Sequence, residues 1–229
     1  DVYKHMASSI YNVPSDEVKG SQRFVGKTTI LGAGYGMGAV KFQTQLAGMG
    51  VEMYLNEARR IIQIYRKKNG AISQLWTDAN NMIHYMARGD TLQFGKEGVL
   101  VVDGVAKSIT LPSGLPMFYT DVSAYDTENG TEYMYKTRKG LNKIYGGKVV
   151  ENVCQAVARC IIGHQMILIA KRYKVVLTVH DSIVVAVPDA DVAEARVYVE
   201  HCMSQKPDWA EGLPITCESG TGKSYGECE

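Results

Sequence analysis

The spacing of apolar residues predicts helices along the first ninety residues of the chain. Apolar positions recur at helical spacing over residues 1–12, and a second helix is expected from Gln22 onward, with Ser21 as its N-cap. Two longer amphipathic patterns follow, at residues 51–68 and 71–88. This part of the chain is therefore expected to be helical.

After residue 90 the pattern changes to short runs in which apolar and polar residues alternate. Asp103-Gly104 and the sequence LPSG at residues 111–114 interrupt these runs, as expected for turns between hairpin strands. The strands are predicted at residues 98–103, 108–111, 116–122 and 131–136.

A long helix is predicted at residues 149–173, and a pair of strands comes directly after it. The two β-branched runs at residues 175–179 and 183–187 flank residues 180–182, which places this tripeptide at the tip of a tight hairpin. A helix and a last short strand complete the pattern, at residues 190–203 and 215–218. The whole indicates an α+β fold with antiparallel strands.

Composition is that of a globular protein. The 229 residues are 45% apolar and 21% charged, which suits one large domain or two lobes and argues against disorder. By inspection no stretch approaches the roughly 18 uncharged apolar residues of a spanning helix, so no membrane contact is expected. The five cysteines are scattered without a C-x-x-C pair, which favours a reducing, cytoplasmic compartment over disulfides or zinc.

The chain begins with Asp1 and has neither an initiator methionine nor an apolar leader, which favours a fragment or a processed product.

Net charge is only +1, but one short region is basic. Its single nearby acid is Glu132, and its cations are Lys136, Arg138, Lys139, Lys143 and Lys148. Such a local excess suits phosphate groups, and the alternative is an ordinary solvated face.

Four residues of the second helix recur every four positions: Arg23, Lys27, Leu31 and Tyr35. On a continuous helix their side chains share one face. A guanidinium and an ammonium at one end can bind a triphosphate, and Leu31 and Tyr35 can contact a base or sugar. The alternative is a surface helix with a buried Leu and Tyr.

The sequence RFVGKTTILGAGYG at residues 23–36 resembles motif B of the family A DNA polymerases, written R-x3-K-x6-7-Y-G. The resemblance implies that Arg23 and Lys27 bind the phosphates of the incoming dNTP and that Lys27 also has a catalytic role. It also implies that Tyr35 packs near the templating base and that Gly36 contacts the DNA. Leu31 departs from the family, which usually has Phe or Tyr beside the nucleotide sugar.

The hairpin sequence VHDS at residues 179–182 resembles motif C of the same family, usually H-D-E. The resemblance implies that Asp181 is catalytic and ligates Mg²⁺ in a two-metal site, and that His180 contacts DNA. Ser182 replaces the usual Glu and is a poorer metal ligand. The alternative is that Asp181 simply favours a turn.

The segment at residues 144–159, IYGGKVVENVCQAVAR, resembles the part that precedes motif C in phage-type members. Gln155 then corresponds to a glutamine that touches the minor groove at the growing end, where acceptors are nearly the same for every base pair. A solvated helix position is the alternative. Cys160 stands where an acid is expected.

The resemblance covers essentially the whole chain and implies a helical fingers subdomain at residues 1–146 and a palm at 147–229. The implied function is template-directed DNA synthesis by a DNA-directed DNA polymerase, with DNA primer-template and deoxynucleoside triphosphates as partners. Motif A, D-Y-S-x-x-E, and the thumb are expected before Asp1, so the second acidic metal ligand lies outside the chain. The alternative is a catalytically silent fragment that only binds primer-template and dNTP.

Two other glycine-rich readings fit poorly. Residues 29–38 follow G-x-G-x-G-x-G rather than the dinucleotide-binding G-x-G-x-x-G, and no βαβ unit follows. Gly222-Lys223-Ser224 resembles the end of a P-loop, but Cys217 stands where its first glycine belongs.

Overall fold

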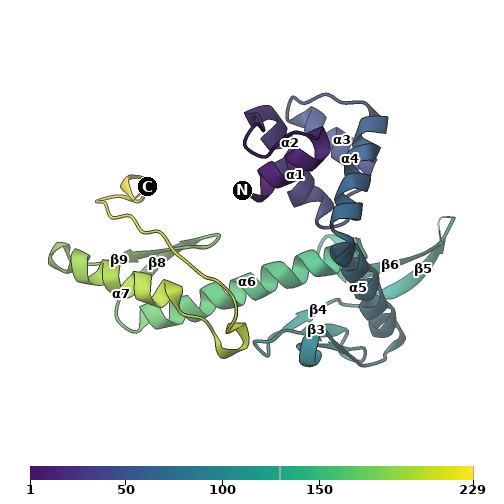
Figure 1. The fold of residues 1–229 in the computed structure, drawn as a ribbon. Coiled ribbons are helices and arrows are strands. Elements are labelled where there is room, and N and C mark those ends of the chain that lie inside the picture. The colour runs from purple at the N-terminus through teal and green to yellow at the C-terminus, as the bar shows by residue number, and fades with distance from the viewer. Residues whose placement is uncertain (129, 229) are drawn as a thin grey trace. The chain divides into compact units, whose positions relative to one another are not determined.

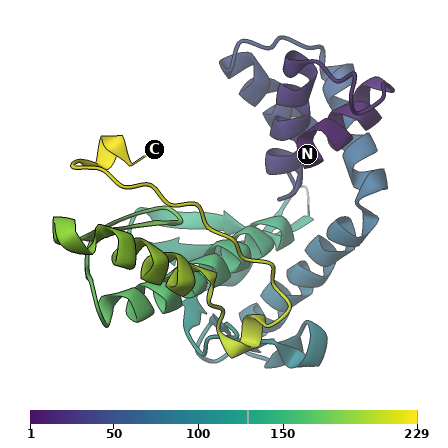
Figure 2. The same ribbon diagram turned by 60° about the vertical axis from the view of Figure 1, so that its left-hand side comes forward.

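The computed structural model describes residues 1–128 and 130–228, which form two compact units (Figures 1 and 2). Unit 1 comprises Asp1–Thr110 and Pro116–Val153, and unit 2 comprises Leu111–Leu115 and the chain from Cys154 onward. The helix α6, at Gly146–Ala170, begins in the first unit and continues in the second.

Unit 1 opens with a helical layer. Its helices are α1 (Val2–Tyr11), α2 (Gly20–Ala33), α3 (Ala39–Gly48), α4 (Leu55–Lys68) and α5 (Gly70–Arg88). The helices expected at residues 1–12 and 71–88 are confirmed within about two residues. The helix α3 has no counterpart in the sequence prediction, because the glycines around it mask its short apolar pattern.

Two predicted helix starts are wrong. Ser21 does not cap α2, because the helix begins at Gly20 with Lys19 as its N-cap, whose N–H donates to Gln22 Oε1 at 2.9 Å. The helix α4 begins at Leu55, and the residues from Val51 to Tyr54 are not helical. The apolar residues that precede α4 continue its periodic pattern, so the sequence predicted a helix that starts too early.

Buried side chains from four helices form the core of this layer. The largest that are fully buried are Met6, Ile10, Phe42, Leu46, Ile61 and Tyr65. Burial of each such side chain contributes about 1.5–3 kcal/mol. Gly26 allows α1 and α2 to cross closely, since a Cβ on it would lie 2.3 Å from the carbonyl oxygen of Tyr3.

Two antiparallel sheets follow α5 in unit 1. The first has the order β1-β2-β3-β4 and the second has the order β5-β6-β7. Their strands are β1 (Leu92–Phe94), β2 (Leu100–Asp103), β3 (Ser108–Thr110), β4 (Pro116–Phe118), β5 (Ser123–Thr127), β6 (Gly130–Thr137) and β7 (Gly140–Ile144), with a short 3₁₀ turn η1 (Lys96–Gly98). The four predicted strands are present, three of them shorter than expected, whereas β1, β5 and β7 were not predicted.

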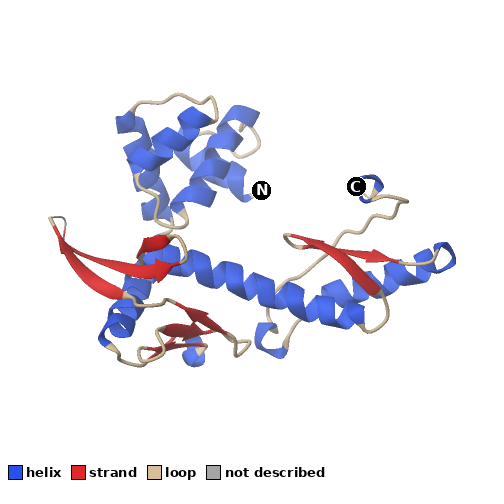
Figure 3. Cartoon of the chain, turned by 180° about the vertical axis from the view of Figure 1, so that it is seen from behind, coloured by secondary structure: helices blue, strands red, loops and turns tan. Residues whose placement is uncertain are grey.

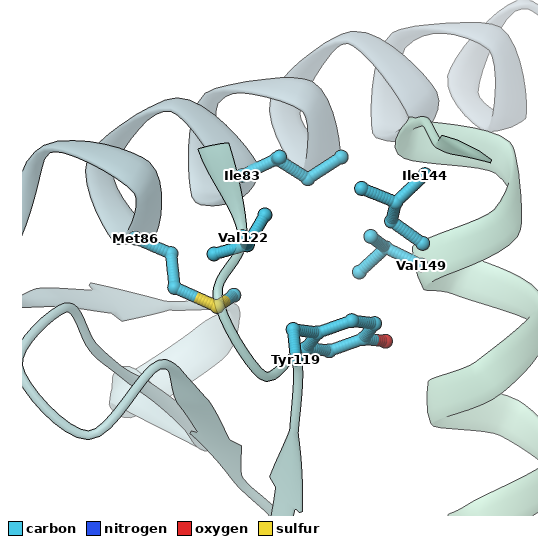
Figure 4. A pocket seen from close by; sticks show the side chains of 6 residues that line it. All are labelled: Ile83, Met86, Tyr119, Val122, Ile144 and Val149. Carbon is cyan, nitrogen blue, oxygen red and sulfur yellow. The ribbon is translucent and has the colours of Figure 1, made fainter. Parts of the chain in front are cut away.

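An apolar cluster joins α5 to these strands and to the start of α6. Its six side chains, Ile83, Met86, Tyr119, Val122, Ile144 and Val149, point toward a common centre (Figure 4). The centre has no space for a water molecule, so this is packed core and not a ligand site. Burial raises the pKa of Tyr119, whose hydroxyl accepts a 3.0 Å hydrogen bond from the amide of Asn152.

Unit 2 contains the rest of α6, a two-stranded hairpin and α7 (Val192–Ser204). The hairpin consists of β8 (Lys174–Val179) and β9 (Ser182–Ala186), and the two helices lie on one side of it (Figures 1 and 3). Tyr198 on α7 donates to the carbonyl oxygen of Leu168 at 2.9 Å, which fixes α7 on α6. Three 3₁₀ turns complete the unit: η2 (Asp189–Asp191), η3 (Asp208–Ala210) and η4 (Tyr225–Glu227).

The strand expected at residues 215–218 is wrong, because this segment pairs with no strand. Side chains hold it instead: the Cys217 thiol and the Ser219 hydroxyl donate to the backbone carbonyl and the carboxylate of Glu200. The α+β class itself is confirmed, with helices and antiparallel sheets in one chain.

The helix α6 bears on the expectation that the chain makes no membrane contact, although it contains the charged residues Lys148, Glu151 and Arg159. It is 25 residues long, and an 18-residue window has a mean hydropathy of 1.5, so length and composition would allow it to cross a membrane. Only 17% of that window is buried. One such helix among the described residues is weak evidence for a membrane span.

Candidate functional site

The exposed face of α2 carries three of the four residues that recur every four positions. Arg23, Lys27 and Leu31 lie on this one helix, with Lys27 exposed and Leu31 51% exposed. The residues between them, such as Val25 and Thr29, are buried against the helical layer. A cationic end and an apolar end therefore face solvent on one stripe.

Tyr35 is not on the continuous helix that the spacing suggested, because α2 ends at Ala33. It lies in the closing turn, where its N–H donates to the carbonyl oxygen of Gly32 at 3.2 Å. Gly36 follows with φ of +82°, a conformation that disfavours other residues. The chain reverses there, so Tyr35 is half-buried beyond the end of the helix instead of continuing its stripe.

Tyr3 lies beside both cations of the stripe. Its ring centroid is 5.2 Å from Arg23 Cζ and 5.9 Å from Lys27 Nζ, within the range of cation–π attraction. The close crossing at Gly26 brings α1 near enough for this contact. Tyr3 was not predicted as a site residue, and the one signal for it in the sequence is Gly26, because a glycine between two cations permits another backbone to pass close by.

Asp1 binds the guanidinium of the stripe. Arg23 Nε donates to Asp1 Oδ2 at 2.7 Å, while Oδ1 of the same carboxylate accepts from the N–H groups of Tyr3 and Lys4 at the start of α1. Both side chains of the ion pair are partly exposed, 41% for Arg23 and 32% for Asp1. The pair therefore orients Arg23 and is open to exchange with another anion.

The turn that carries Tyr35 is held from behind by α5 and by the first residues of α6. Trp76 Nε1 donates to the carbonyl oxygen of Gly34 at 3.0 Å. A Cβ on Gly147 would lie 2.4 Å from the carbonyl oxygen of Tyr35, so only glycine permits this approach. Gly146 is fixed in turn, since its N–H donates to Asn80 Oδ1 at 2.6 Å.

In unit 2, Asp181 lies at the tip of the β8–β9 hairpin, as predicted. Val179 pairs with Ser182, which leaves His180 and Asp181 as a two-residue loop. His180 has a φ of +52°, and both loop residues are exposed. The tight turn therefore presents the Asp181 carboxylate to solvent.

Asp181 is not part of a ready-made metal site in the described part of the chain. Nowhere in residues 1–128 and 130–228 do three His, Cys, Asp or Glu side chains gather closely enough to bind a metal ion. Ser182 adds a hydroxyl but no second carboxylate. This donor set alone does not fit Mg²⁺, which requires octahedral oxygen coordination.

Gln155 is exposed on α6, on a different element of unit 2 from Asp181 and His180. Five residues further along α6, Cys160 Sγ lies 3.2 Å from the hydroxyl of Ser113. This contact ties the LPSG turn to α6, so the cysteine that replaces an expected acid still has a hydroxyl partner.

Comparison with known proteins identifies relatives along almost the whole chain. The family model described as DNA polymerase family A matches residues 1–227. A DNA polymerase of Bacillus phage SP02 is 29% identical over 95% of this chain and 35% of its own length. A DNA polymerase of Bacillus phage SP01 is 23% identical over 99% of this chain and 22% of its own length.

A solved structure shares the fold. It is the POL domain of Pol1 from M. smegmatis in complex with DNA primer-template and dNTP, with a TM-score of 0.53 and 17% identity. The match covers 94% of this chain and 32% of that chain. The chain thus spans about a third or less of the length of each of these proteins.

Proposed function

This chain belongs to DNA polymerase family A, and from that premise we propose that it is the fingers part (1–146) and the palm part (147–229) of an enzyme for template-directed DNA synthesis. The observation that carries the proposal is the exposed cationic stripe of α2, where Arg23 and Lys27 lie beside the ring of Tyr3. An apolar, solvent-facing Leu31 continues that stripe.

In this proposal Arg23 and Lys27 bind the phosphates of the incoming deoxynucleoside triphosphate. The planar guanidinium can bind two oxygens at once, and the ammonium acts as a compact charge on the group that is transferred. Leu31 contacts the nucleotide sugar. Tyr35, which lies in the turn that α5 and α6 hold in place, contacts the templating base. Lys27 stabilises charge that grows on the phosphates during transfer, which is its catalytic role.

Asp181 contributes one carboxylate to a divalent metal site whose second acidic ligand comes from outside the 229 residues. Polymerases of this family generally use divalent metals, and bound Mg²⁺ would neutralise phosphate charge and activate the primer 3′-hydroxyl. What this chain supplies is a tight hairpin that presents the carboxylate to solvent. Gln155, His180 and Gly36 are proposed to contact the DNA primer-template.

The exposed apolar residues of unit 2 support the idea that further polymerase segments, including motif A and the thumb, cover it. Ile167 on α6 is 64% exposed, and Val176 and Leu177 on β8 are 49% and 46% exposed. Large apolar side chains that are exposed on a hairpin and on a helix are typical of surfaces that another segment buries. We propose that the assembled enzyme acts in the cytoplasm of a bacterial or phage-infected cell.

The alternative is a silent fragment that binds primer-template and dNTP without chemistry, and primer extension separates the two. The chain alone should not extend a primer, whereas the chain joined to the preceding segments of its reading frame should, and Asp181→Ala should abolish that activity. If the chain alone extends a primer and Asp181→Ala abolishes this activity, the second acidic metal ligand must lie within the 229 residues, which would contradict the proposal. Lack of extension by the joined protein would favour the silent fragment.

A further inference from the structure

The structure divides the basic region of residues 136–148 into paired and unpaired cations. Lys143 forms an ion pair with Glu132, and Lys148 Nζ lies 2.9 Å from Glu151 Oε2. The remaining three are exposed and form no ion pair within the described part of the chain: Lys136, Arg138 and Lys139. We refer to these three as the turn cations, because they lie at the β6–β7 turn.

The β5–β6–β7 sheet has one face fixed on the protein and one face open. Tyr133 and Tyr135 on β6 mark the fixed face, since the Tyr133 hydroxyl lies 2.9 Å from His84 Nδ1 of α5 and Tyr135 packs edge-on against Tyr119. Side chains alternate along a strand, so Lys136 projects from the opposite face. Leu141 pairs with Lys136 across the strands and is 55% exposed.

The turn between β6 and β7 is braced by its own side chains. Thr137 pairs with Gly140, so Arg138 and Lys139 form a two-residue loop. Thr137 Oγ1 donates to the Gly140 carbonyl oxygen at 2.9 Å and accepts from the Lys139 N–H at 3.2 Å. Asn142 Nδ2 donates to Thr137 Oγ1 at 2.7 Å. The two loop cations are therefore presented on a rigid support, which reduces the entropy lost when they bind.

Protection of a sheet edge does not explain this arrangement. Lysines on edge strands prevent aggregation, and Lys143 on the edge strand β7 fits that role. Lys136 lies on the central strand β6, where no edge needs protection. By contrast, Arg66 and Lys67, which form no ion pair among the described residues, lie in the last turn of α4, where the helix dipole favours them.

We propose that the turn cations bind the sugar–phosphate backbone of duplex DNA. Lys136 lies near the end of β6, and Arg138 and Lys139 lie in the turn that follows it, so the three cations can meet up to three phosphates without reading bases. The inference rests on the proposed function in one respect, since it assumes that this chain binds primer-template DNA. It adds a positioning surface made of residues other than Gln155, His180 and Gly36.

Salt-dependent binding of the 229-residue chain to a fluorescent duplex primer-template tests the inference. The test variant carries Lys136→Gln, Arg138→Gln and Lys139→Gln. The matched control carries Arg59→Gln, Arg66→Gln and Lys67→Gln on α4, three exposed cations without ion pairs in the described chain, which gives the same change of charge. Anisotropy titrations at several salt concentrations give the slope of log K against log [salt].

Each lost phosphate contact should reduce the magnitude of that slope by about 0.9, so the test variant should lose up to about 2.7 and the control much less. Arg138→Gln alone should lose about 0.9 and serves if the triple variant misfolds. Equal slopes in wild type and test variant, or equal losses in test and control, would overturn the inference. Absence of duplex binding by the wild-type chain would overturn the DNA-binding part of the proposed function as well.

Discussion

Trp76 and Gly34 are joined by a hydrogen bond from the indole Nε1 to the carbonyl oxygen, 3.0 Å long. The Trp76 ring also stacks on Tyr65, with centroids 6.5 Å apart and planes at 10°. Gly34 precedes Tyr35 directly. The indole therefore fixes the backbone from which the proposed template-contacting tyrosine projects.

Trp76→Phe should retain most of the stacking and remove the hydrogen bond. The free energy of unfolding should fall by about 1 kcal/mol, measured by urea denaturation, because a partly buried carbonyl loses its donor. In the complete polymerase, the KM for the correct dNTP should rise while duplex affinity stays unchanged. Trp209→Phe in η3 is the control. Unchanged KM in Trp76→Phe would show that the indole does not position Tyr35.

Lys27→Ala should weaken nucleotide use in the complete polymerase. Loss of one positive charge from the proposed triphosphate site should lower kcat/KM for dNTP, by an amount that corresponds to about 2–4 kcal/mol of lost transition-state stabilisation. Lys41→Ala, a similarly exposed cation on α3, is the control. Steady-state kinetics and DNA titrations measure the two effects. An equal loss of DNA affinity without a change in nucleotide use would assign Lys27 to the duplex instead.

Leu31 should discriminate against dideoxynucleotides. At the proposed sugar site, a tyrosine hydroxyl would supply a polar group in place of the missing 3′-hydroxyl, whereas leucine offers only hydrocarbon. Leu31→Tyr should therefore raise dideoxynucleotide use relative to dNTP, and Leu31→Phe should not. Because Leu31 is 51% exposed, either ring can enter without displacing core residues. Competition assays give the ratio of specificity constants, and identical ratios in the two variants would remove Leu31 from the sugar site.

Glu200 should make the stability of unit 2 depend on acid. Hydrogen bonds from the Ser219 hydroxyl and from Arg196 hold the pKa of its carboxyl below the usual 4.5. A depressed pKa in the folded state contributes stability above pH 4.5 that is lost as pH falls through the folded pKa. The urea midpoint of wild type should exceed that of Glu200→Gln at pH 7, and the difference should shrink toward pH 3. A constant difference would show that the charge is not responsible.

The elements that sequence predicted best are those in which periodicity is long or turn chemistry is local. The β8–β9 hairpin is one example, because two β-branched runs on either side of His180-Asp181 can pair only as the two strands of a hairpin. The helix α5 is another, because its apolar stripe repeats at helical spacing over nineteen residues. The start of α4 and the strand at residues 215–218 were wrong because tertiary contacts decide them. Glu200 holds the latter segment, and Glu200 is distant in sequence.

Of the candidate site, sequence located the cations of α2 but not their neighbours. Spacing alone places Arg23, Lys27 and Leu31 on one face, as the structure has them. The contacts of Tyr3 and Asp1 with those cations depend on how α1 crosses α2, which no local pattern encodes. Tyr35 was extrapolated along a helix that ends two residues earlier, because the alternating glycines from Gly32 to Gly38 do not fix where the helix stops.

Gly26 allows α1 and α2 to pack as a single unit. The Tyr3 carbonyl oxygen lies only 2.3 Å from where a Cβ of residue 26 would stand, so the two backbones are in close contact and we expect the two helices to move together. If α2 rotates during a catalytic cycle, Tyr3 and Asp1 would move with it. The aromatic ring beside Arg23 and Lys27 would then accompany them through every conformation, and its ordering entropy is lost once, at folding, rather than at each nucleotide encounter.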